Sequence, residues 1–442
     1  MIPLQRPERT SMEDDEQTAH VRANHKDYTY DMFIMNMSPE PEEVELFGEW
    51  VDTLNERHLY SFEAVRDGAQ RTEVELTRQD GQALQVLNFS SYNYLGFSYH
   101  PEVIEAARDA VSRYGLGAAS SPVISGTYRV HAELEAAIVA YFGLPDRAVS
   151  LFSSGYAVNL GVIQAFIKPG NHVVMDRAAH MSIVDGAKLS GGTVSVFEHN
   201  DMADLERVLK DVCDGFTRVL VCIEGVYSGD GDFGKVRDTV RLAKRYGAFT
   251  LVDEAHSALI AGETGRGVCE AQGVLDDVDF YVMTFSKAFG GVGGAVYARR
   301  AMCRYINWYA KARMFSCALD PAVTGGMARV VALAAGPEGQ ARRSRLLANA
   351  ALLRDRLRGK VDLGVSESWV VTVQYGQDRL TLDVSDHLQR HGLDTSLIQF
   401  PAAPRNQARI RLFVSSEHTA EQLERAAAIV LDTATRFGFR TG

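Results

Sequence analysis

The chain has 442 residues, of which 46% are apolar, and a formal net charge of −11 at pH 7. This length allows one large and one smaller domain, and an acidic chain without a basic tract argues against nucleic-acid binding. No apolar run reaches the roughly 18 residues that a membrane-spanning helix needs, and no signal-peptide pattern is present. The five scattered cysteines include no CxxC pair, which favours reduced thiols, a cytoplasmic location and no metal site.

The first 80 or so residues are polar and are expected to be irregular, apart from one helix at Pro41–Glu56. Within them the acidic run Glu13-Asp14-Asp15-Glu16 is interpreted as a solvated lead-in. The next expected elements are a short strand, a helix that begins at a proline, a glycine- and serine-rich loop and a second helix: Val86–Phe89, Pro101–Tyr114, residues 115–127 and His131–Phe142.

From residue 149 onward, short apolar runs alternate with helical patterns. Strands are expected at Val149–Phe152, Val173–Met175, Thr193–Phe197, Val219–Ile223, Phe249–Asp253, Phe280–Phe285 and Ala295–Tyr297. Helices are expected at Ser182–Leu189, Ala203–Val212 and Val236–Tyr246. This β/α alternation predicts an α/β fold with a mostly parallel central sheet flanked by helices.

After about residue 330 the pattern changes, which predicts a smaller α+β domain. Its expected elements are a long helix, two strands and a closing helix from Glu417; the first three lie at Ala341–Leu357, Trp369–Gln374 and Arg409–Val414. We therefore expect three parts: an N-terminal segment at residues 1–95, a large domain at 96–330 and a small C-terminal domain at 331–442.

Two of the expected strands end in polar, chemically capable residues. Asp253 and His256 follow one apolar run, and Ser286 and Lys287 follow another. The carboxyl ends of parallel strands meet at one rim, where open α/β sheets bind ligands. A carboxylate there can hold a protonated pyridine nitrogen, and a lysine can form a Schiff base, which together suggest pyridoxal 5′-phosphate (PLP). The alternatives are a surface lysine and a helix-capping aspartate.

Many further motifs occur in a fixed order from about Asn88 to the C-terminus. They are Tyr94-Leu95-Gly96, Ser125-Gly126-Thr127, Ser154-Gly155-Tyr156-Ala157-Val158-Asn159-Leu160, His180 with Asp185-Gly186, Glu224-Gly225-Val226-Tyr227-Ser228, Asp253-Glu254-Ala255-His256-Ser257, Thr284-Phe285-Ser286-Lys287 and Arg409-Ile410-Arg411. With these motifs the chain resembles the α-oxoamine synthases, PLP enzymes of the aspartate-aminotransferase fold. The resemblance implies a fold-type I PLP-dependent transferase.

The resemblance also implies roles for four residues around the cofactor ring. Lys287 matches the Schiff-base lysine, which later acts as acid and base at the amino-acid Cα. Asp253 matches the carboxylate that keeps the pyridine nitrogen protonated. His256 matches the residue that hydrogen-bonds the ring phenolate oxygen. His180 matches the histidine stacked on the ring, with a satisfied structural histidine as its alternative.

Further positions match the family's phosphate and substrate contacts. Those near the cofactor phosphate or elsewhere at the cofactor are Ser154, Gly155, Tyr156, Ser228, Thr284, Ser286 and, reaching the partner subunit's site, Ser316. Arg411 matches the arginine that holds the amino-acid carboxylate, and Arg409, on the same strand face, is the weaker choice. Tyr92 and Asn93 resemble the serine palmitoyltransferase branch and suggest substrate contacts with a long acyl chain.

The resemblance implies a decarboxylative condensation of serine, glycine or alanine with an acyl thioester, carried by coenzyme A or by an acyl carrier protein, in a homodimer with composite sites. A fold-type I aminotransferase and a non-catalytic partner subunit are the alternatives. Three positions depart from the family pattern, and their effect is open: Pro122, Cys317 and Asp320.

Overall fold

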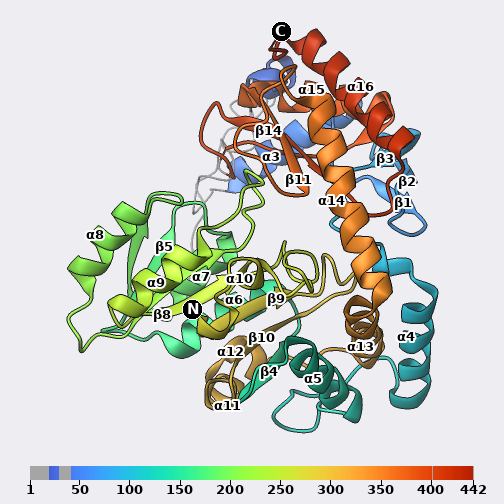
Figure 1. Ribbon diagram of the computed structural model, residues 1–442. Helices are drawn as coiled ribbons and strands as arrows, with labels where there is room; N and C mark the ends of the chain where they lie inside the picture. The colour runs from blue at the N-terminus through green and yellow to red at the C-terminus, as the bar shows by residue number, and fades with distance from the viewer. Residues whose placement is uncertain (1–18, 29–40, 401, 442) are drawn as a thin grey trace, which may run out of the picture.

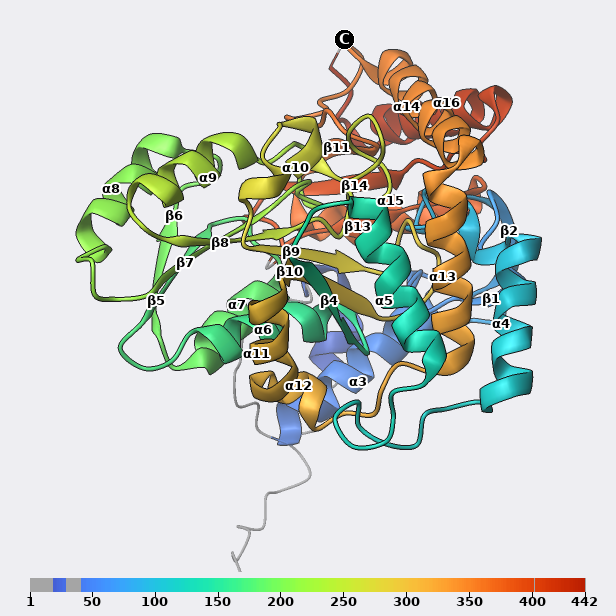
Figure 2. The same cartoon turned by 60° about the horizontal axis from the view of Figure 1, so that its bottom comes forward.

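A seven-stranded sheet forms the centre of the larger part of the computed structural model, which describes residues 19–28, 41–400 and 402–441 (Figures 1 and 2). The strand order is β4-β10-β9-β8-β7-β5-β6, and only β10 runs antiparallel to its neighbours. The strands are β4 (Arg147–Phe152), β5 (His172–Asp176), β6 (Thr193–Phe197), β7 (Val219–Glu224), β8 (Phe249–Asp253), β9 (Phe280–Thr284) and β10 (Gly294–Arg299). The prediction of a mostly parallel α/β sheet is confirmed.

Helices cover both faces of this sheet, because successive strand residues point to opposite sides. In β7, Leu220 and Cys222 pack into one core with α6 (Gly155–Phe166), α7 (Met181–Ser190) and α11 (Arg300–Tyr309). Val221 and Ile223 pack into the other core with α5 (Arg129–Phe142), α8 (Met202–Val212) and α9 (Val236–Arg245). Figure 2 shows the sheet edge-on between these two layers. Burial on both faces accounts for the continuous apolar runs in the sequence.

A long helix connects the large sheet to the C-terminal part of the chain. This helix, α14 (Pro337–Leu357), follows α13 (Pro321–Ala335) and packs against α16 (Ala420–Phe437), as Figure 1 shows in orange and red. In turn, α13 packs on α4 (Pro101–Tyr114) and on α5. The Asp320 side chain accepts a hydrogen bond from the Val323 amide at 2.8 Å and so caps α13. Capping explains why an aspartate stands at this position.

Two small sheets lie beside the C-terminal helices. One contains β11 (Val370–Gly376), β14 (Ala408–Phe413) and β13 (Ser396–Ile398) in that order. The other contains β1 (Val65–Asp67), β2 (Glu73–Thr77), β3 (Ala83–Asn88) and β12 (Leu393–Asp394). Its last pair, β3 with β12, is parallel and joins the N-terminal segment to the C-terminal part of the chain. The proposed division at residues 95 and 330 stays a prediction.

Several expectations need correction. The region before residue 80 is not irregular throughout, because β1 and β2 occupy part of it, although α3 (Pro41–Glu56) has the expected bounds. The closing helix α16 begins at Ala420, after a Thr419 cap, and not at Glu417. The sequence analysis did not anticipate α10 (Val268–Ala271), α11, α12 (Lys311–Met314), α13 or α15 (Thr381–Arg390).

The acidic run Glu13–Glu16 lies outside the described residues. Among the helices that the structure does describe, none combines the length and apolar character needed to cross a membrane.

Candidate active site

The carboxyl ends of neighbouring strands bring the predicted residues to one edge of the large sheet. Asp253 ends β8, and Glu224 ends β7 directly opposite it in the strand register. Lys287 follows β9 after Thr284 and a short turn, and Ser154 follows β4. The sequence predicted this convergence from the parallel strand order.

The Asp253 carboxylate is buried and held in a fixed orientation. Asn159 on α6 donates its side-chain amide to Asp253 Oδ2 at 2.6 Å, and the Ala255 backbone amide donates to Oδ1 at 2.9 Å. The same Asn159 amide contacts Ser182 Oγ at 3.0 Å. These contacts position the carboxylate to receive a cationic N–H group.

Lys287 is half-buried at the same edge. Burial lowers the pKa of its amine, and the nearby carboxylates of Asp253 and Glu224 act in the opposite direction. Its Nζ lies 5.9 Å from the centre of the Tyr92 ring. A lysine whose pKa is lowered has more of the neutral amine that can act as nucleophile or base.

His180 and Glu224 form a connected pair beside Lys287. The His180 backbone amide donates to Glu224 Oε1 at 2.6 Å, and its ring Nδ1 lies 2.8 Å from Ser182 Oγ. Burial lowers the pKa of His180, so its ring is neutral at pH 7. Burial, together with the charge of Asp253, raises the pKa of Glu224 well above its usual range. Glu224 is therefore a protonated carboxylic acid.

His256 is fully enclosed by aromatic residues. Its Nδ1 lies 2.8 Å from the Tyr94 hydroxyl, and its backbone carbonyl accepts a hydrogen bond from the Trp369 indole at 2.9 Å. The rings of Tyr92 and Phe413 complete the enclosure. Burial and the nearby Lys287 cation hold the pKa of His256 well below its usual range, so the imidazole is neutral.

Hydroxyl groups and free backbone amides gather at the start of α6. Ser154 caps this helix through the Ala157 amide, which leaves the first-turn N–H groups of Gly155 and Tyr156 without intrahelical partners. Thr284 Oγ1 lies 2.8 Å from Ser286 Oγ, and a Cβ at Gly155 would come within 2.6 Å of Thr284 Oγ1. Only glycine allows this close approach. The arrangement suits an anion such as a phosphate.

Arg411 and Arg409 extend from β14 with different partners. Arg409 forms an ion pair with Asp230. Arg411 instead contacts the Ser228 carbonyl at 3.2 Å, Ser396 Oγ at 2.7 Å and the Tyr92 side chain, and its guanidinium carbon lies 5.2 Å from the centre of the Phe413 ring. Within the described residues, Arg411 Nε is buried without a hydrogen-bond partner, and no carboxylate pairs with its guanidinium. Arg411 therefore has capacity to bind a carboxylate, and Arg409 does not.

Within the described structure, three predicted site residues, Asn93, Ser228 and Ser316, form no hydrogen bond with Lys287 or Asp253. Asn93 is buried, and its amide is engaged by Ser98 Oγ at 2.8 Å and by the Gln70 carbonyl. Ser228 faces Arg411 through its carbonyl. Ser316 is partly exposed and lies between two exposed neighbours after α12. Their roles stay predictions.

Sequence reasoning assigned no role to four residues that hold the site together: Asn159, Glu224, Tyr94 and Trp369. The first three lie inside the motifs that were recognised, and Glu224 ends a predicted strand in the same way as Asp253. That strand-end position was an available signal. Trp369 had none, because its contact with His256 joins β11 to the β8 rim over more than 100 residues.

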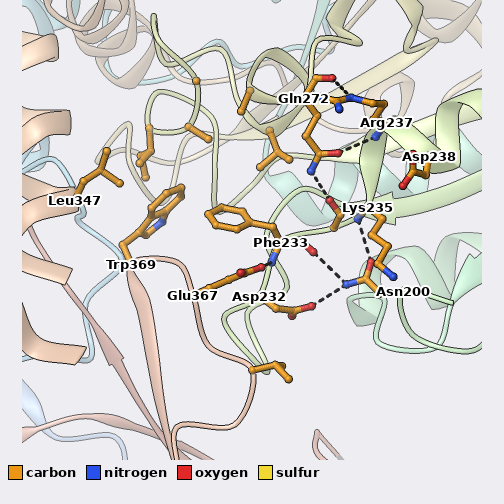
Figure 3. A pocket seen from close by; sticks show the side chains of 17 residues that line it. Asn200, Asp232, Phe233, Lys235, Arg237, Asp238, Gln272, Leu347, Glu367 and Trp369 are labelled. Atoms are coloured by element: carbon orange, nitrogen blue, oxygen red, sulfur yellow. Dashed lines mark hydrogen bonds between the residues drawn. The ribbon is translucent and has the colours of Figure 1, made fainter. Parts of the chain in front are cut away.

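A separate cavity of about 710 Å3 is lined in part by Trp369 (Figure 3). Its walls include Phe233, Trp369 and Leu347, and the polar side chains of Asn200 and Gln272 are bonded to the surrounding loop. None of the predicted site residues lines it. Trp369 therefore contacts both places: it lines this cavity, and its indole N–H donates to the His256 carbonyl.

Known proteins with similar sequences and structures also point to a PLP-dependent enzyme. The family model for aminotransferase class I and II matches residues 85–430. An 8-amino-7-oxononanoate synthase of Citrifermentans bemidjiense is 37% identical over 89% of this chain and 100% of its own length. The corresponding synthase 1 of Bacillus subtilis is 33% identical over 89% of this chain and 98% of its own.

Solved serine palmitoyltransferases have the same fold. The Sphingomonas wittichii enzyme has a TM-score of 0.83 at 30% identity, over 89% of this chain and 97% of that one. The S. paucimobilis enzyme, with PLP and myriocin bound, has a TM-score of 0.82 at 29% identity, over 89% and 98%. Similarity over almost the full length of both chains agrees with the site geometry, and the chain belongs to the aminotransferase class I and II family, as one of its α-oxoamine synthases.

Proposed function

We propose that this protein uses PLP to condense an amino acid with an acyl thioester, releasing CO2 and a thiol and giving an α-aminoketone. The observation that carries the proposal is the pairing of Lys287, a lysine with a lowered pKa, with the oriented carboxylate of Asp253 at one sheet edge. Relatives along the whole chain are named as synthases of this kind, and serine palmitoyltransferase has been solved with PLP bound.

The residues present fit PLP. Asp253 would receive the pyridine N–H, the neutral His256 would face the ring oxygen, and His180 would lie against the ring. The hydroxyls of Thr284 and Ser286 and the first amides of α6 would hold the phosphate. The phosphate contacts depend on glycine at position 155, because a Cβ there would collide with Thr284 and push the first turn of α6 away from the two hydroxyls. When bound, PLP would supply an electron sink for the negative charge that forms at the amino-acid Cα.

The residues of this chain would divide the remaining work. Arg411, whose guanidinium lacks a carboxylate partner in the described structure, would bind the amino-acid carboxylate through charge-assisted hydrogen bonds. Lys287, as a neutral amine, would take the proton from Cα and return a proton later. Burial lowers the pKa of His256 and raises that of Glu224, which favours the uncharged form of both side chains beside the ring.

The position of Tyr92 supports a thioester with a long acyl chain as the acyl donor. The centres of the Tyr92 and Phe413 rings are 4.6 Å apart, and Lys287 Nζ lies 5.9 Å from the centre of the Tyr92 ring, so apolar surface lies beside the reacting amine. Burial of acyl methylenes on such surface contributes roughly 25 cal/mol per Å2. Thiol release should then rise from acetyl to decanoyl and longer thioesters, and a flat or inverted profile would contradict this assignment.

A homodimer is proposed from the apolar side chains around Ser316. Phe315 is 81% exposed and Ile124 is 79% exposed, and a hydrogen bond from Ala318 N to Ser120 O links their two segments. Exposed apolar side chains in one region are typical of an interface. Sedimentation should give a dimer, and a fully active monomer would refute it. All five cysteines are free thiols, which supports the proposed cytoplasmic location.

The decisive experiment mixes the purified protein with PLP, with each of serine, glycine and alanine, and with an acyl thioester. Free thiol should appear with at least one amino acid, in equal amount to CO2. Lys287→Ala should bind PLP through Asp253 and the phosphate contacts, yet release no thiol. A keto acid formed without thiol would instead indicate the aminotransferase alternative. PLP found by mass spectrometry on another lysine after borohydride reduction would disprove the assignment of Lys287.

A further inference from the structure

Two helices of the C-terminal part bring two histidines and an aspartate together, outside the proposed active site. His387 lies on α15, His391 follows one turn later at its end, and Asp432 lies on the adjacent helix α16. One ligand atom from each lies within 4.8 Å of the other two. None of the three contacts Lys287, Asp253 or the residues around them.

We propose that His387, His391 and Asp432 bind a zinc ion, through Nε2 of each histidine and a carboxylate oxygen, with water as the fourth ligand. Zinc accepts this set of ligands, and a bonded ion would draw the three atoms closer, to about 2.0–2.2 Å from the metal. This proposal departs from the expectation of no metal site, which was drawn from the scattered cysteines without a CxxC pair; that pattern bears on thiolate ligands and not on a histidine–carboxylate site.

The hydrogen bonds of His391 leave its Nε2 ready to bind a metal. Its Nδ1 lies 2.7 Å from the His387 backbone carbonyl. A carbonyl oxygen only accepts, so Nδ1 carries the proton and Nε2 carries the lone pair in the neutral ring. In zinc sites the second ring nitrogen is held in the same way, by donation to a carbonyl or carboxylate oxygen.

The hydrogen bonds of His387 lead to the same tautomer. Its Nδ1 lies 3.1 Å from Thr433 Oγ1, and the Thr433 hydroxyl donates its own proton to the Ile429 carbonyl at 2.8 Å. Thr433 Oγ1 must therefore accept from His387 Nδ1–H, which leaves the lone pair on Nε2. That Nε2 lies 3.7 Å from Asp432 Oδ2. Two acceptors facing each other at this distance are stabilised by a cation between them.

The surroundings keep the site suited to a metal ion. The His387 and His391 rings stack with their centroids 3.9 Å apart, so both imidazoles lie on the same side of the α15–α16 contact as Asp432. His391 and Asp432 are exposed, so an ion can enter from solvent.

Such an ion would act as a cross-link between α15 and α16, and this role goes beyond the proposed catalysis. Because α16 also packs on α14, zinc would stabilise the C-terminal part without entering the reaction. Zinc should therefore raise the midpoint of thermal unfolding and leave the rate of thiol release unchanged.

The test uses the untagged PLP-loaded protein after treatment with a chelator, in a Cys317→Ser background that removes the exposed thiol. Titration calorimetry with zinc chloride should give one site per chain. His391→Gln and Asp432→Asn, both at exposed positions, should each weaken zinc binding by about 10-fold or more. Cobalt(II) should give a visible band that is lost in both variants.

The matched control is His58→Gln, because His58 is an exposed histidine that also contacts an aspartate, Asp80 at 2.9 Å, without a second histidine. This control should bind zinc as the parent does and keep the zinc-dependent rise in unfolding temperature. Absence of a stoichiometric site, or equal zinc affinity in all variants, would show an adventitious ion only and overturn the proposal. Thiol release tests the proposed catalysis separately from zinc binding.

Discussion

Glu224 and Asp253 lie opposite each other at the ends of the adjacent parallel strands β7 and β8. Burial and the neighbouring carboxylate raise the pKa of Glu224, so it is the protonated member. Its Oε1 accepts the His180 backbone amide at 2.6 Å. Glu224 therefore acts as a neutral hydrogen-bonding group that places His180.

This assignment predicts that Glu224→Gln is nearly silent. Glutamine keeps both the shape and the oxygen that accepts from His180, so PLP affinity and thiol release should stay close to those of the parent. Glu224→Ala removes that acceptor and should cost about 1–3 kcal/mol of stability, because the His180 amide loses its partner. Equal damage from both substitutions, measured by PLP titration and urea unfolding, would mean that Glu224 works as an ionised carboxylate.

Substitution of the two β14 arginines should separate substrate binding from stability. Arg411→Ala should keep PLP but lose about 1.5–3 kcal/mol of amino-acid binding, an increase of roughly 10- to 150-fold in the concentration needed. Arg409→Ala breaks the ion pair with Asp230 and should lower the unfolding temperature while sparing amino-acid affinity. Titration of the cofactor absorbance with amino acid distinguishes them, and a reversed pattern would move the carboxylate site to Arg409.

His199 should make stability depend on pH. Its ring bridges Asp176 and Asp232 at 2.8 and 3.0 Å, and although burial opposes the charge, these carboxylates raise its pKa to about 10. A raised folded-state pKa gives stability that is fully present below the unfolded-state value of about 6.5 and is lost as pH rises towards 10. The difference in unfolding free energy between the parent and His199→Gln should therefore shrink from pH 6.5 to 10. A difference independent of pH would show that His199 is neutral in the folded state.

We expect Asp320 to act as the N-terminal cap of α13. Asp320→Ala removes the acceptor of the Val323 amide and should lower stability by about 1 kcal/mol, whereas Asp320→Asn keeps an acceptor oxygen and should lose less. Urea unfolding measures both variants. Loss of thiol release without loss of stability would indicate that Asp320 has a role in the reaction.

The sequence predicted the central sheet, and the clustering of Asp253 and Lys287 at the carboxyl ends of its strands, because both follow from the pattern of residues within each strand. Asp253 and Lys287 each follow an apolar run that is buried on both faces, and parallel order alone brings such strand ends together. The ordering of the motifs then suggested which residue holds which part of the cofactor.

Contacts between distant segments were not predictable from the same signals. Asn159 points at Asp253 only because α6 packs across the sheet, and Trp369 reaches His256 from another sheet. β1 and β12 contain three and two residues, too short for a periodic pattern, and they are strands only because β2 and β3 pair with them. Asp320 directly precedes Pro321, as a helix cap often does, but no prediction was drawn from this position in the sequence.

The parallel pairing of β3 with β12 has a consequence for synthesis on the ribosome. Leu87 and Asn88 emerge early, yet their partners Leu393 and Asp394 are translated about 300 residues later. At roughly 5–20 residues per second, that interval is on the order of 15–60 s. During this interval the edge of β3 that later pairs with β12 has no partner strand, and the apolar side chain of Leu87 is not yet covered by Leu393. We therefore expect the unpaired β3 edge of the nascent chain to be open to chaperone binding until β12 covers it.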